Sequence, residues 1–234
     1  MNILFTCAGR RNYLLKYFKS VNGVRVIACD ANCLAPALYQ ADEYFLVPDV
    51  FDKNYVSVLF KEAIERNIDA IIPLNDLELP ILATNKEKFE AQNIKVLISD
   101  NNIVDICFDK YKTIEFTESI PVNKIPTFIN IDDALSYKNM HPGCKFILKP
   151  RWGSASLGIE YLLGNDDLRY MYNILKQKIK NTIHNKISNF DPANCIIIQK
   201  MITGQEYGMD IINNLKGEYE GTLIRKKLAM RAGE

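Results

Sequence analysis

One loop of this chain combines a lysine with small residues in an arrangement suited to binding phosphate. Lys149 ends an apolar run, and the small residues of the loop that follows it include Gly153, Ser154, Ser156 and Gly158. A polyphosphate carries many acceptor oxygens, so its site needs closely approaching backbone N–H groups and one or two cations. The pattern predicts such a site. It lacks the Gly-Lys-Ser/Thr of a P-loop, and an ordinary hairpin connection remains the alternative.

A second segment, later in the chain, has the residue types that the rest of a nucleotide would need. Gln199 and Lys200 end an apolar run, Ile202 follows them, and Glu206 comes after a glycine. A base needs an amide or carboxylate partner for its edge and apolar walls for its faces, while a ribose needs an acceptor for its hydroxyls. The segment predicts a base and ribose site. A hairpin with solvated polar tips is the alternative.

The elements expected to position these residues begin with a regular alternation of strands and helices. Strands are predicted over residues 3–8, 24–30, 44–47, 70–73 and 95–98, and helices over 12–20, 55–67 and 79–92. Strict alternation favours a parallel sheet with helices on both faces. We therefore predict an α/β, Rossmann-like domain over residues 1–105.

The regular alternation of strands and helices ends after residue 99, and we expect a second domain over residues 106–234. Helices are predicted over 101–117, 131–139 and 166–187, and strands over 145–149, 159–163, 196–200, 206–213 and 219–226. The last two strands are joined by Asn214-Leu215-Lys216-Gly217, a hairpin signal. This half is predicted to be α+β with antiparallel pairing.

Composition excludes several function classes. The 29 basic and 28 acidic residues nearly cancel, so no global field would draw the chain to nucleic acid or to an anionic membrane. No segment approaches the ~20 apolar residues of a membrane span. The six cysteines form no CxxC pair, and we interpret them as buried thiols. We expect a soluble cytoplasmic protein with neither nucleic-acid nor membrane partners.

Taken in order, three features resemble a known family. They are Lys110, Lys149 with its loop, and the segment from Gln199 to Glu206. Together they resemble the nucleotide-binding half of the ATP-grasp ligases, which are ATP-dependent carboxylate-amine ligases, and above all proteins similar to the large subunit of carbamoyl phosphate synthase. The resemblance spans essentially the whole chain. It implies a Rossmann-like pre-ATP-grasp domain over 1–105 and an incomplete ATP-grasp domain over 106–234.

The resemblance implies a role for each matching residue. Lys110 and Lys149 would bind phosphates of ATP, and residues 153–158 would form the flap over them. In the complete enzyme, ATP would phosphorylate a substrate carboxylate, and an amine or similar nucleophile would attack the acylphosphate. The two lysines would stabilise charge on the transferring phosphate. No further catalytic residue is identified.

The second segment takes its roles from the same resemblance. Gln199 would face the adenine amino group, where glutamate is commoner in the family. Lys200 and Ile202 would meet the adenine edge through their backbone. Glu206 would bind the ribose hydroxyls.

Magnesium is the second cofactor that the resemblance implies. In the family, Mg²⁺ is held by acidic residues and an asparagine on strands well after the ribose-binding glutamate, whereas this sequence ends at Glu234. We therefore expect the Mg²⁺ ligands beyond residue 234 and interpret the chain as an amino-terminal fragment. Phosphoryl transfer depends on metal bridging the phosphates, so such a fragment is expected to turn over poorly if at all.

The resemblance also implies candidate substrate contacts in the first domain. The loop after the first strand contains Arg10 and Arg11, either of which could hold a substrate carboxylate, with solvated arginines as the alternative. Glu78 is a third candidate; the alternative there is a helix end capped by Asp76. The sequence identifies neither the carboxylate nor the amine. A homodimer is compatible with it, but the oligomeric state is not readable.

Two other functions stay open on the sequence. An NAD(P)-dependent Rossmann oxidoreductase is supported by Asp30, which ends the second strand, and opposed by the missing glycines of GxGxxG. A non-catalytic nucleotide-binding module is the alternative that is not an enzyme.

Overall fold

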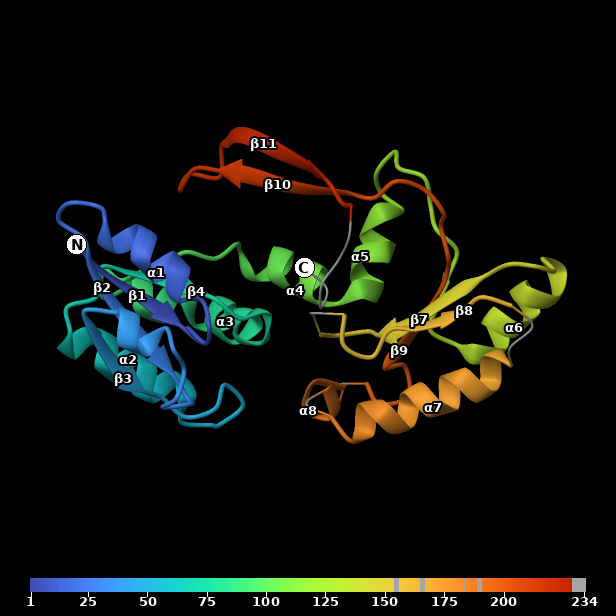
Figure 1. The fold of residues 1–234 in the computed structure, drawn as a ribbon, viewed down its shortest axis with the longest axis horizontal. Helices are drawn as coiled ribbons and strands as arrows, with labels where there is room; N and C mark the ends of the chain where they lie inside the picture. Colours follow the sequence, from blue (N-terminus) through green and yellow to red (C-terminus); the bar gives the residue numbers. More distant parts are fainter. Residues whose placement is uncertain (154–155, 165–166, 183, 189–190, 229–234) are drawn as a thin grey trace. The chain divides into compact units, whose positions relative to one another are not determined.

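The chain separates into two compact units, Met1–Asp105 and Ile106–Glu234 (Figure 1). This computed structural model describes residues 1–153, 156–164, 167–182, 184–188 and 191–228. Each unit has a sheet of its own.

The first unit is built on a five-stranded parallel sheet in the order β3-β2-β1-β4-β5. Its strands are β1 (Asn2–Thr6), β2 (Arg25–Asp30), β3 (Glu43–Leu46), β4 (Ala70–Pro73) and β5 (Lys95–Val96). The helices are α1 (Asn12–Lys19), α2 (Tyr55–Glu65) and α3 (Leu79–Glu90), with short 3-10 turns η1 (Leu38–Gln40) and η2 (Asp76–Glu78). This arrangement confirms the predicted α/β class.

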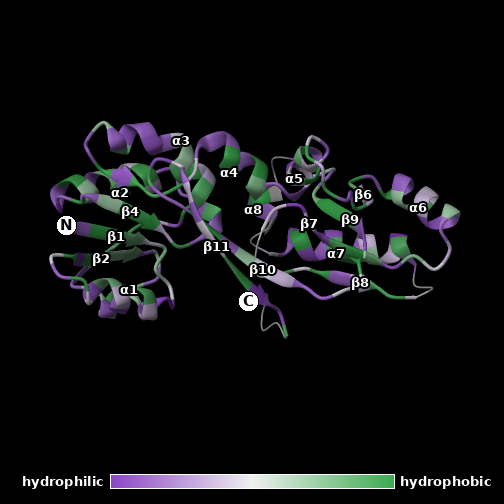
Figure 2. Cartoon of the chain, turned by 90° about the horizontal axis from the view of Figure 1, so that it is seen from above, coloured by the Kyte–Doolittle hydropathy of each residue, from purple (hydrophilic) through white to green (hydrophobic). Residues whose placement is uncertain are grey.

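Both faces of this sheet are covered by apolar side chains. On one face, Leu4 and Ile71 pack with Phe89 of α3. On the other, Phe5 packs with Leu15 of α1. Strands buried on both faces need continuous apolar runs, which is why β1, β2 and β4 are mostly hydrophobic along their length (Figure 2). The parallel sheet also gathers the carboxyl ends of its strands at one edge.

The second unit contains a four-stranded antiparallel sheet in the order β6-β9-β7-β8. Its strands are β6 (Thr127–Phe128), β7 (Phe146–Pro150), β8 (Glu160–Leu162) and β9 (Ile196–Lys200). The helices are α5 (Lys110–Thr117), α6 (Ile131–Met140), α7 (Leu168–Lys180) and α8 (His184–Ser188), and α4 (Asn101–Phe108) leads into the unit. Antiparallel pairing was predicted here, and the sheet confirms it.

A separate hairpin of β10 (Tyr207–Asn213) and β11 (Tyr219–Lys226) follows this sheet. Its turn is closed by the N–H of Gly217, which donates to the carbonyl of Asn214 at 2.9 Å. The Asn214 N–H in turn donates to the carbonyl of Glu218 at 2.9 Å. The predicted hairpin is confirmed.

Alternation along β7 decides where Lys149 lies. Phe146, Leu148 and Pro150 are buried, and helix α7 packs against this strand. The residues between them, Ile147 and Lys149, project from the opposite face because successive strand residues alternate. The lysine is thereby presented on the face of the sheet away from α7.

Two predicted helices are each divided in two. The helix expected over 101–117 breaks at Asp109, whose backbone is extended and whose carboxylate accepts the N–H of Tyr111 at 2.9 Å. This aspartate caps a new helix, because the first N–H groups of a helix have no partner within it. The helix expected over 166–187 ends at Lys180, with Asn181 as its C-cap, and α8 begins at His184.

The interpretation of the cysteines as buried thiols is only partly correct. Cys29 and Cys195 are buried, and Cys7 and Cys144 are half-buried. Cys33 and Cys107 are exposed. Of the six, only Cys29 lies within a strand, and the buried Cys195 directly precedes β9.

Replacement of Gly158 by alanine is expected to destabilise the second unit by about 1–3 kcal/mol. Its φ is +75°, and a Cβ would approach Pro150 Cγ at 3.0 Å. Gly164→Ala is the matched control, because it has no positive φ and no atom within 4 Å of the added carbon. Urea unfolding followed by the fluorescence of Trp152 measures both; equal stability of the two variants would contradict the prediction.

Candidate functional site

A pocket of about 220 Å³ in the second unit brings the two predicted phosphate lysines together. Lys110 enters from the start of α5, and Lys149 from β7. Other lining residues are Pro150, Trp152, Gly153, Ser156, Leu157 and Ile159. Two cations and a small-residue loop thus share one cavity, which is the composition that phosphate binding needs. Ser154, another predicted contact, lies outside the described residues.

Lys149 is half-buried on the sheet face. Its Nζ donates to Oε1 of Gln199 at 3.0 Å. Burial lowers the pKa of this lysine, because desolvation penalises its charged form. An anion bound in the pocket would compensate for the lost hydration and favour the ammonium.

The orientation of the Gln199 amide follows from its two partners. Its Nε2 donates to Oγ1 of Thr127 at 2.9 Å, and that hydroxyl donates to the carbonyl of Ile125 at 2.9 Å. A hydroxyl has one proton, so Thr127 can only accept from the amide, while the ammonium of Lys149 can only donate to it. Both ends therefore turn the amide oxygen toward Lys149. A second lone pair on that oxygen can accept from an amino group.

Lys110 holds the loop through backbone carbonyls. Its Nζ donates to the carbonyl of Gly153 at 2.7 Å and to that of Arg151 at 3.3 Å. Its backbone N–H also donates to the carbonyl of Arg151, at 3.2 Å. The start of α5 is thereby tied to the loop that follows Lys149.

Two residues that the sequence analysis did not single out support this arrangement. Asp109 caps α5 and binds the Arg151 guanidinium through both carboxylate oxygens. Burial alone would raise the pKa of Asp109, but hydrogen bonds from Arg151 and Tyr111 lower it. The preference of aspartate for helix N-caps was the available signal for Asp109. No local pattern indicated Arg151 as its partner.

The remaining predicted nucleotide contacts lie apart from the pocket. The N–H of Lys200 donates to the carbonyl of Pro126 at 2.9 Å, so it is already used by the sheet. Ile202 is exposed beyond the end of β9. Glu206 precedes the hairpin, where its carboxylate pairs with Lys227 at 2.6 Å. The pocket accordingly unites Lys110, Lys149, Gly153 and Ser156, whereas predicted contacts that do not line it are Gly158, Gln199, Lys200, Ile202 and Glu206.

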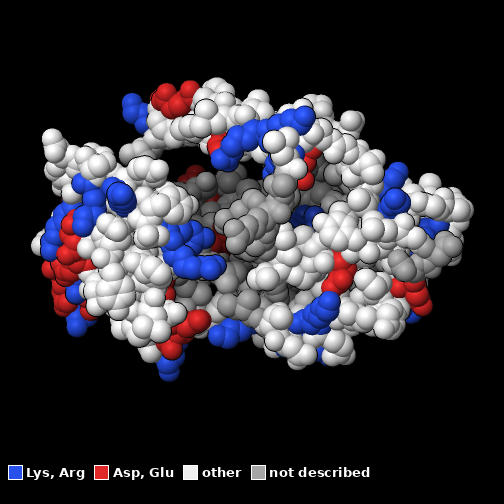
Figure 3. All heavy atoms as spheres, in the orientation of Figure 1, with Lys and Arg blue, Asp and Glu red and all other residues white. Residues whose placement is uncertain are grey.

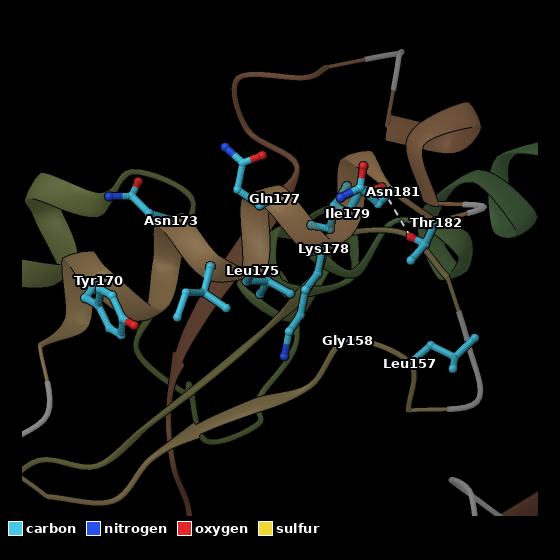
Figure 4. Close-up of a pocket in the computed structure, with 11 residues that line it drawn as sticks. Leu157, Gly158, Tyr170, Asn173, Leu175, Gln177, Lys178, Ile179, Asn181 and Thr182 are labelled. Atoms are coloured by element: carbon cyan, nitrogen blue, oxygen red, sulfur yellow. Dashed lines mark hydrogen bonds between the residues drawn. The ribbon is translucent and has the colours of Figure 1, made fainter.

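A larger, mainly apolar cavity of about 610 Å³ lies along α7. Figure 4 shows α7 along one side of it and the segment at Leu157 and Gly158 along the other. Leu175 and Ile179 contribute apolar walls. Leu157 lines both cavities, so the lysine pocket and the groove along α7 adjoin at this residue.

The sheet edge of the first unit carries the substrate candidates. Arg10 is exposed and Arg11 is half-buried, in the turn between β1 and α1. Asp30 braces this turn: its Oδ2 accepts the N–H of Gly9 and its Oδ1 that of Asn32, both at 2.8 Å. Both carboxylate oxygens of Asp30 are thus occupied by the chain itself.

Glu78 lies in the interior, with none of its surface exposed. Its carboxylate accepts the hydroxyl of Tyr55 at 2.7 Å and the N–H of Leu74 at 3.2 Å. The expected cap by Asp76 is wrong, because Asn75 caps this turn by accepting the N–H of Leu77 at 2.9 Å. With no exposed surface, Glu78 supports the sheet edge from inside.

The stability of the first unit is expected to fall as pH rises above the ordinary Glu pKa of 4.5, because burial raises the pKa of Glu78. The unfolded chain loses this proton first, so folding becomes less favourable by about 1.4 kcal/mol per pH unit until the folded pKa is passed. Glu78→Gln removes the titration. Urea unfolding of the wild type and of Glu78→Gln between pH 4 and 8 measures the effect. A difference in unfolding free energy between the two proteins that does not change with pH would contradict the prediction.

Over the first unit, basic and acidic side chains are intermixed (Figure 3), as in the pairs Lys19–Asp42 at 2.8 Å and Arg25–Glu43 at 2.5 Å. This agrees with the near-zero net charge. Among the described residues, no helix combines the length and the apolar character needed to cross a membrane.

Comparisons with known proteins agree with these observations. Residues 3–97 match the family model of the PylC-like N-terminal domain. The chain is 28% identical over 225 residues to carbamoyl-phosphate synthase from Methanobrevibacter smithii, a match that covers 94% of this chain and 53% of that protein. The chain therefore spans about half the length of this curated relative.

Solved structures share the fold at low sequence identity. An L-amino acid ligase from Bacillus licheniformis superposes with a TM-score of 0.69 at 18% identity, over 97% of this chain and 52% of that one. The biotin carboxylase domain of Hydrogenobacter thermophilus 2-oxoglutarate carboxylase, solved with MgADP, ADP and bicarbonate, gives 0.66 at 15% identity, over 90% and 46%. The predicted resemblance is confirmed at this level: residues 3–97 match the PylC-like N-terminal domain, the chain is similar to a carbamoyl-phosphate synthase, and its fold is similar to those of the amino acid ligase and the biotin carboxylase domain.

Proposed function

We propose that this chain forms the ATP-binding part of an ATP-grasp ligase that activates a substrate carboxylate as an acylphosphate for attack by an amine or similar nucleophile. The pocket that unites Lys110 and Lys149 with the loop at Gly153 and Ser156 is the observation that carries this proposal. Residues 1–105 would serve as the pre-ATP-grasp domain and residues 106–234 as the nucleotide-binding region.

The two lysines would bind the phosphates of ATP and stabilise the charge that develops on the transferring phosphate. The amide oxygen of Gln199 would accept from the adenine amino group, because the hydrogen-bond chain through Thr127 presents an acceptor there. Glu206 would bind the ribose hydroxyls. Arg10 and Arg11 are the proposed contacts for the substrate carboxylate.

Magnesium is considered because one solved structure with a similar fold contains it. The biotin carboxylase domain of Hydrogenobacter thermophilus was solved with MgADP. Within the described part of this chain, no group of three or more His, Cys, Asp and Glu side chains could hold a metal ion. These residues therefore offer no Mg²⁺ site made of protein side chains alone, whereas Mg²⁺ bound with ATP is usually held by one or two carboxylates together with the phosphates.

The rival reading as an oxidoreductase is less well supported. A dinucleotide site uses the acidic residue after the second strand to accept ribose hydroxyls. Here both oxygens of Asp30 accept backbone N–H groups of the chain. Titration with NADH, followed by the fluorescence of the cofactor, tests this alternative directly; saturable binding would favour it.

Replacement of Lys149 by alanine is expected to weaken ATP binding roughly 10- to 150-fold, the equivalent of one charge-assisted hydrogen bond of about 1.5–3 kcal/mol. Titration followed by the fluorescence of Trp152, which lines the pocket, measures the affinity. Lys145→Ala is the matched control, because Lys145 is exposed just before β7. Wild-type affinity in the Lys149 variant would sink the proposed function.

A further inference from the structure

A buried ion pair connects the two segments that carry the pocket lysines. Nε of Arg151 donates to Oδ1 of Asp109 at 2.8 Å, and Nη2 donates to Oδ2 at 2.7 Å. The side chains are only 11% and 4% exposed. Nη1 reaches Oδ2 of Asp191 at 3.2 Å. We name this group, Asp109, Arg151 and Asp191, the clamp.

The position of the clamp in the sequence is informative. Asp109 immediately precedes Lys110, and Arg151 comes two residues after Lys149. The carbonyl of Arg151 also accepts both the backbone N–H and the Nζ of Lys110. The clamp therefore joins the start of α5 to the end of β7, which are the two elements that present the lysines.

The guanidinium itself is directed to the carboxylates. Nε, Nη1 and Nη2 each donate to Asp109 or Asp191, and the two carboxylates more than offset its single positive charge. The guanidinium carbon also lies 4.6 Å from the ring centroid of Trp152. Arg151 lies next to the pocket yet does not line it. It is therefore suited to hold other groups in place and poorly placed to bind a phosphate itself.

We propose that Asp109 and Arg151 are positioning residues that hold Lys110 and Lys149 at the spacing a polyphosphate requires. Two ammonium groups lining one small pocket repel each other, and the repulsion is strongest when no anion is bound. A rigid cross-link between their elements keeps both cations in place before the anion arrives. Preorganisation of this kind increases affinity because less order is lost on binding.

This inference rests on the proposed function for the identity of the ligand, but it makes a claim of its own. Affinity that depends on the clamp must come from the phosphates. A clamp variant should lose affinity for polyphosphates and keep its affinity for a nucleoside without phosphate. General loss of structure would weaken binding of both kinds of ligand.

The test uses Asp109→Asn in the full chain, because asparagine caps helices as well as aspartate but removes the charge and one of the two oxygens that accept from Arg151. Calorimetric titration with ATP, inorganic tripolyphosphate and adenosine gives three affinities at a temperature where circular dichroism shows the variant folded. We expect the affinities for ATP and tripolyphosphate to fall at least tenfold, with adenosine unchanged within twofold. Arg151→Lys should also lower the affinities for ATP and tripolyphosphate, because lysine keeps the charge but loses the paired contact.

Asp132→Asn is the matched control, since it removes the exposed pair of Asp132 with Arg169, 72% and 52% exposed, in the same unit. Its affinities should equal those of the wild type. Unchanged ATP and tripolyphosphate affinities in Asp109→Asn would overturn the inference, as would an equal loss for adenosine.

The same titrations separate this inference from the proposed function. If the wild-type chain binds ATP no more tightly than tripolyphosphate, the nucleotide proposal is refuted. The proposed role of the clamp is then tested by the affinities for tripolyphosphate alone. Failure of the wild type to bind any of the three ligands would refute both.

Discussion

Alanine in place of Arg151 is expected to lower the free energy of unfolding of the second unit by about 3–5 kcal/mol. The substitution leaves the carboxylate of Asp109, which is 4% exposed, without the cation that compensates for its lost hydration. It also removes packing of the guanidinium on Trp152. Trp152 is the only tryptophan, so urea unfolding followed by its fluorescence reports on this unit.

The matched control is Arg169→Ala. Arg169 pairs with Asp132, but both side chains are more than half exposed, so this change should cost at most about 1 kcal/mol. Adding Asp109→Asn to Arg151→Ala should recover part of the loss, because the uncompensated charge is then absent. Equal losses in the two single arginine variants would show that the pair with Asp109 behaves as a solvated surface contact.

Phe89→Ala is the second large effect, with an expected loss of about 3–5 kcal/mol in the first unit. Phe89, on α3, is completely buried, and its ring meets that of Phe60 edge-on, with 5.3 Å between centroids. Truncation removes this contact and leaves a cavity in the core between the sheet and its helices. Hydrogen exchange of peptides from residues 1–105, measured by mass spectrometry, reports the local free energy of opening.

Phe116→Ala tests whether burial causes that effect. Phe116 lies on α5 and is 47% exposed, so the same change of side chain should cost under about 1 kcal/mol. A loss in Phe89→Ala no larger than in Phe116→Ala would mean that the core around Phe89 collapses onto the vacated space.

Prediction of the fold succeeded where one local pattern leads to one structure. The apolar runs of β1 and β4 and the helical spacing of α2 each indicate a single type of element. The strict alternation of strands and helices then favours a parallel sheet covered by helices. The division of the predicted helix at Asp109 was missed because an aspartate inside a helical pattern is read as a surface residue until its cap geometry is visible.

The candidate site was predictable in its parts. Lys149 with its glycine and serine loop stands out by residue type, and Lys110 was placed by family resemblance. Their joint lining of one pocket could not be predicted from spacing, because it depends on how α5 packs against the end of β7. The hydrogen-bond chain from Lys149 to Gln199 and Thr127 likewise depends on the register of three strands.

The sequence by itself determined the element types, the alternation that makes the first sheet parallel, and the identity of the lysines and the loop. Only the tertiary structure decided that Arg151 pairs with Asp109, that Glu78 is buried and that Asp30 braces the turn between β1 and α1. The physical reason is the distance along the chain over which each interaction acts. Periodicity and turn chemistry act between neighbours in the chain, whereas desolvation and ion pairing depend on which distant segments meet.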